Sequence, residues 1–295
     1  MHCGIGLECS RARGETFDQA IAQASAAGFG FVEPFVYSGV ELELNSHQTV
    51  RTHSPFHHLD PQHTDAAATR RLMRAAGLRF SAFDAHSSLL LPQIAVPQLT
   101  RVLDFAAQLE CPVVMSDEGP VALEWMSLDR AFDVLSFTLE PILAHARARG
   151  VRFAIELHNA LTVRPEYLAR LLQRFGPDEL GLNFDTGNFF LAGNDPVAFL
   201  KSTADRVVHV HLKDIPESQL AQRGRVTGTR VGVAVGDGTV DVPGVVEALA
   251  SANYRGVLSV ECETWEQARR SRAYLETLLA PAWKTPAPSS ATGAP

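Results

Sequence analysis

Eight short apolar runs alternate with stretches of helical periodicity along this chain of 295 residues. The runs lie at about 3–8, 30–35, 79–85, 112–116, 151–157, 180–185, 206–212 and 257–262. Strands separated by helices pair in parallel, because a parallel connection needs a crossover segment. Eight strand–helix units therefore predict a single-domain α/β fold, the (β/α)8 TIM barrel. A doubly wound open sheet is the runner-up, but no glycine-rich phosphate loop follows the first run.

Capping residues support the helical stretches. Thr16 with Gln19 forms a capping-box pattern before one apolar stripe. Pro165, at a first-turn position, and Gly176 bracket another predicted helix.

The barrel is expected to cover residues 1–280. Two segments within it, 36–64 and 214–240, lack periodicity and are predicted to be long loops. Residues 281–295 are rich in Pro, Ala and Ser without an apolar pattern, which predicts a disordered tail.

Charge and composition exclude several function classes. The formal net charge of −7 supplies no basic surface for nucleic acid and no attraction to an anionic membrane. No apolar run approaches the ~20 residues of a spanning helix, and no signal peptide is visible. The four cysteines form no CxxC pair, which favours reduced thiols and a cytoplasmic location.

Four of the predicted strands carry acidic or imidazole side chains on one face. They are AIELHN (154–159), LNFDTGN (182–188), HVHLKD (209–214) and LSVECE (258–263). Alternation with period two places each polar set opposite the apolar residues of its strand. Parallel strands are normally covered on both faces, and buried charge is costly unless it is paired or bound to a metal. The four strands therefore predict one shared metal site.

The predicted ligands are Glu156, Asp185, His211 and Glu261, each at the C-terminal end of its strand. Function in a (β/α)8 barrel lies at that end. Three carboxylates and one imidazole suit a divalent cation, with Mn²⁺ as the first choice and Mg²⁺, Co²⁺ or Zn²⁺ as alternatives. One or two open coordination positions would remain for a chelating substrate.

Five further residues are predicted to contact substrate, and three of them have a plainer alternative. His86 and Glu33 lie on the opposite half of the rim. His158 is an extra ligand, an acid or base, or a loop histidine. Lys213 neutralises a developing oxyanion or pairs with a carboxylate. Asn188 contacts substrate or completes a turn.

At these motifs the sequence resembles the xylose-isomerase-like TIM-barrel superfamily, which includes sugar phosphate isomerases and epimerases. The resemblance is firmest over 150–280, where GDGTVD at 236–241 also matches, and it is collinear over 1–150. It implies one divalent metal held by Glu156, Asp185, His211 and Glu261. It also implies that Glu156 and Glu261 are the catalytic acid and base, because the first and last glutamates have these roles in the superfamily's epimerases.

Two features depart from that pattern. Ketose 3-epimerases often carry a histidine where this chain has Asn188. The connection after the seventh strand, within 214–240, is longer than usual and resembles branches that act on oxidised (3-keto) sugars and glycosides.

The predicted function is a divalent-metal-dependent sugar isomerase or epimerase. A ketose or keto-sugar would lose a proton to one glutamate and pass through a metal-bound enediolate. The main alternative is a lyase or dehydratase of 3-keto sugars or glycosides, in which the same intermediate expels a β leaving group. An AP endonuclease of the endonuclease IV type and a non-catalytic sugar-binding barrel are less favoured. The expected partner is a small-molecule sugar, without nucleic acid or membrane, and a homo-oligomer is left open.

Overall fold

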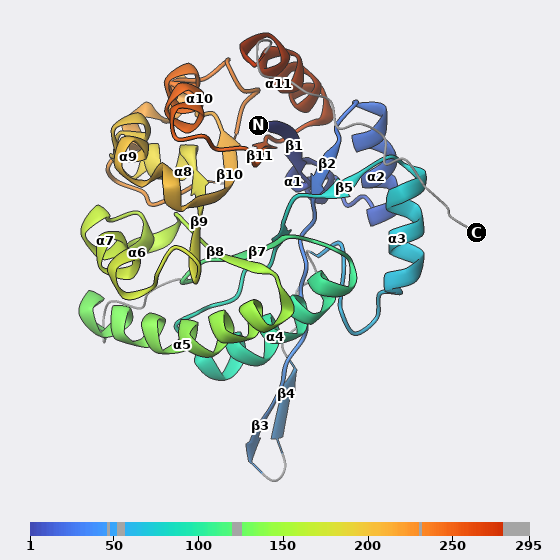
Figure 1. The fold of residues 1–295 in the computed structure, drawn as a ribbon, viewed down its shortest axis with the longest axis vertical. Coiled ribbons are helices and arrows are strands. Elements are labelled where there is room, and N and C mark those ends of the chain that lie inside the picture. Colours follow the sequence, from blue (N-terminus) through green and yellow to red (C-terminus); the bar gives the residue numbers. More distant parts are fainter. Residues whose placement is uncertain (46–47, 52–56, 120–125, 230–231, 280–295) are drawn as a thin grey trace.

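The barrel strands form one sheet that almost closes on itself (Figure 1). The structure, a computed structural model, describes residues 1–45, 48–51, 57–119, 126–229 and 232–279. The sheet order is β5-β2-β1-β11-β10-β9-β8-β7-β6, and every pairing in it is parallel. The strands are β1 (His2–Gly6), β2 (Phe31–Glu33), β5 (Arg79–Phe80), β6 (Phe83–Asp84), β7 (Val113–Ser116), β8 (Arg152–Glu156), β9 (Leu180–Asp185), β10 (Val207–Lys213) and β11 (Val257–Glu261).

The two edges of the sheet belong to a single predicted strand. β5 and β6 are both parts of the run 79–85, and β5 pairs with β2 while β6 pairs with β7. The eight predicted runs thus correspond to eight strand positions around the barrel, which we call staves. One stave is interrupted and consists of β5 and β6. The single-domain (β/α)8 barrel is confirmed and the open sheet is excluded.

Helices surround the sheet on its outer side (Figure 1). The α-helices are α1 (Glu8–Ala12), α2 (Phe17–Ala26), α3 (Ala66–Ala75), α4 (Pro92–Gln108), α5 (Leu128–Arg149), α6 (Asn159–Thr162), α7 (Pro165–Arg174), α8 (Thr186–Leu191), α9 (Pro196–Thr203), α10 (Val242–Ser251) and α11 (Trp265–Leu278). Two 3-10 helices are η1 (Ala204–Arg206) and η2 (Glu217–Gln222). The predicted capping box is present, because Thr16 and Gln19 exchange both hydrogen bonds at the start of α2.

Two local predictions are wrong. The first strand ends at Gly6 instead of residue 8, and Glu8 begins α1, where it forms an i,i+3 ion pair with Arg11 at 2.5 Å. The segment 36–64 is not irregular throughout, because it contains the antiparallel hairpin of β3 (Glu41–Asn45) and β4 (Gln48–Arg51). The hairpin projects away from the barrel (Figure 1). The tail 281–295 lies outside the described residues, so its predicted disorder stays a prediction.

The apolar core has two parts, which explains where the polar site lies. The larger cluster fills the space between strands and helices. A small apolar group on the other strand face consists of Ala82, Val113, Met115 and Ala154. Residues two positions further along these strands, such as Asp84 and Glu156, are polar and buried. The lumen thus changes from apolar to charged toward the C-terminal ends of the strands.

All four cysteines are buried and unpaired. Across the described residues, no helix has both the length and the apolar character needed to cross a bilayer.

Candidate metal centre and active site

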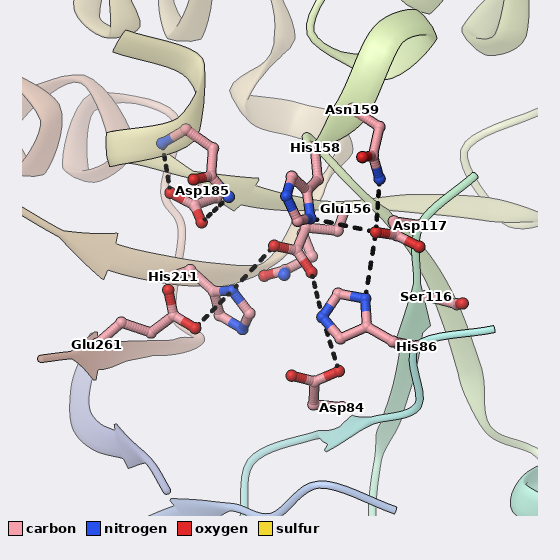
Figure 2. A network of polar contacts seen from close by, with 12 residues as sticks. Asp84, His86, Ser116, Asp117, Glu156, His158, Asn159, Asp185, His211 and Glu261 are labelled. Carbon is pink, nitrogen blue, oxygen red and sulfur yellow. Dashed lines mark hydrogen bonds and ion pairs between the residues drawn. The ribbon is translucent and has the colours of Figure 1, made fainter. Parts of the chain in front are cut away.

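The four predicted ligands converge at the C-terminal ends of β8, β9, β10 and β11 (Figure 2). Nδ1 of His211 lies 3.5 Å from Oε1 of Glu156 and 3.5 Å from Oε1 of Glu261. One donor atom each of Glu156, Asp185 and His211 lies within 4.8 Å of the other two. Strand register explains the convergence, because His211 is the direct partner of Asp185 and Lys213 that of Glu261.

Glu33 lies behind His211 and orients its ring. Oε1 of Glu33 is 2.6 Å from Nε2 of His211, and its Oε2 is 3.4 Å from Nε2 of His209. The ionised carboxylate can only accept, so Nε2 carries a proton and Nδ1 faces Glu156 and Glu261. Nδ1 is buried and has no hydrogen-bond partner among the described residues. In a typical metal-binding histidine, one ring nitrogen binds the metal and the other donates its N–H to a carboxylate or carbonyl oxygen. Nδ1 and Nε2 of His211 are arranged for these two roles.

The carboxylates around Nδ1 of His211 favour a positive charge at that atom. Burial alone would lower the pKa of His211, but Glu33, Glu261 and Glu156 outweigh it and raise the pKa well above its ordinary value. Burial raises the pKa of Asp185, and Glu261 and Glu156 raise it further against the attraction of Lys213. Either a proton or a cation at Nδ1 relieves this repulsion. The oxygen-rich donor set fits a hard divalent cation, so these residues suit the metal that the sequence predicts.

Asn188 and Lys213 hold two of the carboxylates in place. The side chain of Asn188 donates to Oδ2 of Asp185 at 2.5 Å, and its backbone N–H donates to Oδ1 at 2.8 Å. Nζ of Lys213 lies 3.1 Å from Oδ2 of Asp185 and 2.6 Å from Oε2 of Glu261. Burial alone would lower the pKa of Lys213, but Asp185 and Glu261 raise it, so the ammonium keeps its charge.

A second cluster lies beside Glu156 on the other half of the rim (Figure 2). Nε2 of His86 is 3.2 Å from Oδ1 of Asp84 and 3.5 Å from Oε2 of Glu156. Oδ2 of Asp117 is 3.3 Å from Nδ1 of His86 and 3.1 Å from Nδ1 of His158. Burial alone would lower the pKa of His86, but Asp84, Asp117 and Glu156 raise it well above the ordinary value. The raised pKa favours the protonated ring, which would place an N–H donor next to Glu156.

The start of α6 is held onto this cluster by two acidic neighbours at the end of β7. Asn159 has a left-handed φ of 61° and donates from its side chain to Oδ2 of Asp117 at 2.7 Å. Glu118 is fully buried and accepts from the backbone N–H of Leu161 at 2.6 Å, with Oγ1 of Thr162 2.8 Å from its Oε2. Burial, together with Asp117, raises the pKa of Glu118 to about 8.

Both clusters face one pocket of about 500 Å³. Its wall combines the metal-site residues Glu156 and Glu261 with the second cluster and with Arg11 and Phe35 at the mouth. Pockets of this size hold small organic ligands.

The structure brings most of the predicted substrate contacts to this pocket. His86, His158, Asn188 and Lys213 all line it. Glu33 does not, because its side chain is 2% exposed and both oxygens face His209 and His211. The structure thus places Glu33 beside His211 and outside the residues that line the pocket.

Sequence reasoning missed Asp84 and Asn159 as residues of the site, and it placed Asp117 at the rim without giving it a role. Asp84 alternates with His86 with period two, so the shared face was detectable. Asp117 precedes Glu118 at the end of the fourth run, and its position alone suggested the rim. The contact of Asn159 depends on a left-handed backbone that no local pattern announces.

Solved structures share this fold over nearly the whole chain. A D-tagatose 3-epimerase-like protein superposes with a TM-score of 0.74 at 18% identity, covering 95% of this chain and 97% of that one. A xylose isomerase domain protein from Planctomyces limnophilus superposes with a TM-score of 0.70 at 22% identity, covering 95% and 96%. At these identities the likeness concerns the fold alone.

Curated relatives match part of the chain. An inosose dehydratase from Lacticaseibacillus casei is 28% identical over 166 residues, which are 51% of this chain and 56% of the relative. The rhizopine catabolism protein MocC from Rhizobium meliloti is 36% identical over 121 residues, 39% of this chain and 37% of the relative. The chain thus spans about half the length, or less, of these relatives.

One family description covers nearly the whole fold. The family described as "Xylose isomerase-like TIM barrel" matches residues 21–278, which include all four predicted ligands and the barrel strands from β2 to β11. The chain belongs to the xylose isomerase-like TIM barrel family.

Proposed function

We propose that this protein is a metal-dependent enzyme that removes a proton from the carbon next to the carbonyl of a polyhydroxylated ketone. The observation that carries the proposal is the convergence of Glu156 and Glu261 on Nδ1 of His211, beside a pocket that both glutamates line. A divalent cation held by Glu156, Asp185, His211 and Glu261 would polarise the substrate carbonyl and make the adjacent C–H bond more acidic.

Glu156 is the proposed base. Its Oε2 is buried, lacks a hydrogen-bond partner among the described residues and lies 3.5 Å from Nε2 of His86. Burial alone would raise the pKa of Glu156, but His211 and His86 lower it to about 2, so the group is ionised at neutral pH. It can accept a proton from a ligand in the pocket without first losing its own.

Dehydration is the outcome that we favour. His86 places an acidic N–H beside the base, on the same side of the pocket. The proton would pass to Glu156, the C–H electron pair would form a C=C bond, and the β C–O bond would break as His86 protonates the departing hydroxyl. One water molecule leaves, and no oxidant or reductant is needed. The curated relatives named inosose dehydratase support this outcome.

Epimerisation is the second candidate, and a different observation favours it. Glu261 lies across His211 from Glu156, each with Oε1 3.5 Å from Nδ1. Two carboxylates on opposite sides of a bound ketone could remove a proton from one face and return it to the other.

Proton exchange in heavy water tests the shared first step. The Mn²⁺-loaded protein is incubated with a cyclic keto-polyol and with a ketohexose, and recovered substrate and products are analysed for deuterium. We expect label uptake or label-dependent elimination, and Glu156→Gln should slow it by at least ~100-fold. Glu140→Gln, at an exposed ion pair with Arg174, is the matched control and should be unaffected. No exchange and no product from either ketone class would refute the proposal.

Product identity then separates the two outcomes. An unsaturated ketone with release of water identifies a dehydratase, whereas an inverted hydroxyl carbon identifies an epimerase. His86→Gln should suppress dehydration more than deuterium uptake, because the residue acts on the leaving group. Equal loss of both would assign His86 to substrate binding instead.

A further inference from the structure

The long connection after β10 passes along the pocket at Gly228 and Thr229, which we call the strap. Thr229 lines the pocket together with Asn188 and Lys213. The sequence singled out this connection for its length, and the proposed chemistry gives it no part.

The strap is tied to residues that already hold the metal-binding carboxylates. The backbone N–H of Thr229 donates to Oδ1 of Asn188 at 3.0 Å. Nζ of Lys213 donates to the carbonyl oxygen of Thr229 at 3.1 Å. The same two side chains bind Oδ2 of Asp185 with their other contacts. The backbone N–H and the carbonyl oxygen of Thr229 are therefore held at a fixed position relative to Asp185.

The outer end of the connection is anchored to the chain that follows β9. The guanidinium of Arg223 donates to the carbonyl oxygens of Phe190 and Asn194 at 3.2 Å and 2.9 Å. The backbone N–H of Gly224 donates to the carbonyl oxygen of Leu191 at 2.7 Å. A segment fixed at both ends presents a preformed wall and loses little entropy when a ligand binds.

Glycine is required where the strap meets the second cluster. A Cβ atom on Gly228 would lie 2.7 Å from Cδ2 of His158 and 3.0 Å from Oδ1 of Asn188. The peptide therefore packs directly against the imidazole of His158, and the strap joins the two halves of the site.

The charges around the strap select against an anionic ligand. Of the described lining residues, Arg11 pairs with Glu8 at 2.5 Å and Lys213 pairs with Glu261 at 2.6 Å. The imidazoles of His86 and His158 are also paired, because Oδ2 of Asp117 lies 3.3 Å and 3.1 Å from their Nδ1 atoms. Asp84, Asp117 and Glu156 add further acidic groups to the pocket wall. A phosphorylated sugar would meet these carboxylates, whereas hydroxyl groups can bond to them and to the strap.

We propose that the strap is a substrate-recognition element, with Thr229 contacting a neutral, unphosphorylated polyol and its position set by Asn188 and Lys213. The expected effect on KM rests on the proposed function, whereas the expected binding of a neutral polyol at the strap does not. This proposal names a specificity-determining residue and a ligand class that the metal site alone does not define.

Thr229→Ala and Thr227→Ala form a matched pair, because Thr227 is exposed on the same segment and does not line the pocket. We expect Thr229→Ala to raise KM for the keto-polyol and Kd for myo-inositol, used as an unreactive neutral probe, by about five- to tenfold. The value of kcat should fall less than KM rises, and Mn²⁺ affinity should stay within about twofold. Thr227→Ala should match the parent protein. If the two variants behave alike, the proposal is overturned.

Limited proteolysis gives a readout that needs neither turnover nor a variant. Arg223 and Arg225 are exposed trypsin sites at the base of the strap. Addition of myo-inositol to the Mn²⁺-loaded protein should slow cleavage after Arg225, and myo-inositol hexakisphosphate should not. Protection without turnover of any ketone would support the strap while contradicting the proposed reaction. Equal cleavage with and without myo-inositol would overturn the strap.

Discussion

At the scale of single residues, His211 is the centre of the site because its two ring nitrogens have different neighbours. Nε2 is bound by Glu33 at 2.6 Å, and Nδ1 faces Glu156 and Glu261. The contact with Glu33 joins residues 178 positions apart, and it fixes both the tautomer and the ring plane. A buried carboxylate outside the pocket lining thus orients the ring that would hold the metal.

Glu33→Gln should weaken Mn²⁺ binding by about 10- to 100-fold, because the amide can still accept from Nε2 but no longer raises the basicity of the ring. Calorimetric titration of Mn²⁺ into the chelator-treated protein measures the change. Glu140→Gln serves as the surface control. An unchanged Mn²⁺ affinity in Glu33→Gln would show that Glu33 does not act through His211.

Glu118 makes a prediction about pH. Its folded-state pKa of about 8 lies above the ordinary value of 4.5, because burial and Asp117 disfavour the charged form. The folded state therefore binds a proton that the unfolded state releases between these two values, and this contribution to stability is complete below pH 4.5 and lost as pH rises toward 8. Glu118→Gln removes the titration, so its free energy of unfolding relative to the parent should increase by about 1–3 kcal/mol between pH 5 and pH 8.5. Urea unfolding at both pH values measures it, and a constant difference would contradict the prediction.

At the scale of elements, the ends of strands double as the beginnings of helices. Asp185 ends β9 and is the N-cap of α8, accepting from the backbone N–H of Asn188 at 2.8 Å. His158 and Asn159 likewise stand at the start of α6. The carboxylate that caps α8 is thus also a predicted metal ligand, and the cap fixes its position.

Two substitutions separate these roles of Asp185. Asp185→Asn keeps a capping side chain but loses the charge, whereas Asp185→Ala loses both. In the presence of chelator we expect Asp185→Ala to be less stable than Asp185→Asn by about 1 kcal/mol. With Mn²⁺, both should lose the stabilisation of the parent protein. Equal stability of the two variants in chelator would mean that the cap contributes nothing.

At the scale of the whole molecule, the four predicted ligands come from consecutive staves β8 to β11, and β11 closes onto β1. A cation bound there links segments that are far apart in the sequence, so it stabilises only the closed barrel. The interrupted stave β5–β6 lies opposite, where Asp84 and His86 form the second cluster.

Metal binding should therefore shift global unfolding. With free Mn²⁺ at 100 times its Kd, the free energy of unfolding should rise by about 2.7 kcal/mol, and chelator should reverse the change. Thermal or urea unfolding followed by circular dichroism measures this shift. Identical unfolding curves in Mn²⁺ and in chelator would exclude a metal site in this barrel.

The barrel, its eight staves and the set Glu156, Asp185, His211 and Glu261 could be read from the sequence. Period-two alternation is a property of the extended backbone, and charges in a parallel strand need a partner wherever that strand lies. The break within 79–85 and the hairpin in 36–64 escaped the same reasoning, because short pairings depend on neighbours that local periodicity does not reveal.

The contacts between ligands and their supports were decided only by tertiary structure. Three such contacts join segments that are distant in sequence. They are the hydrogen bond between Glu33 and His211, the hydrogen bond from the backbone of Leu161 to Glu118, and the packing of Gly228 against His158. Closure of the barrel brings these segments together, and the absence of a side chain at Gly228 allows the close approach to His158. The period-two alternation in the sequence therefore predicts which side chains face the lumen. Which of these side chains contact one another is decided by how the distant segments pack in the folded barrel.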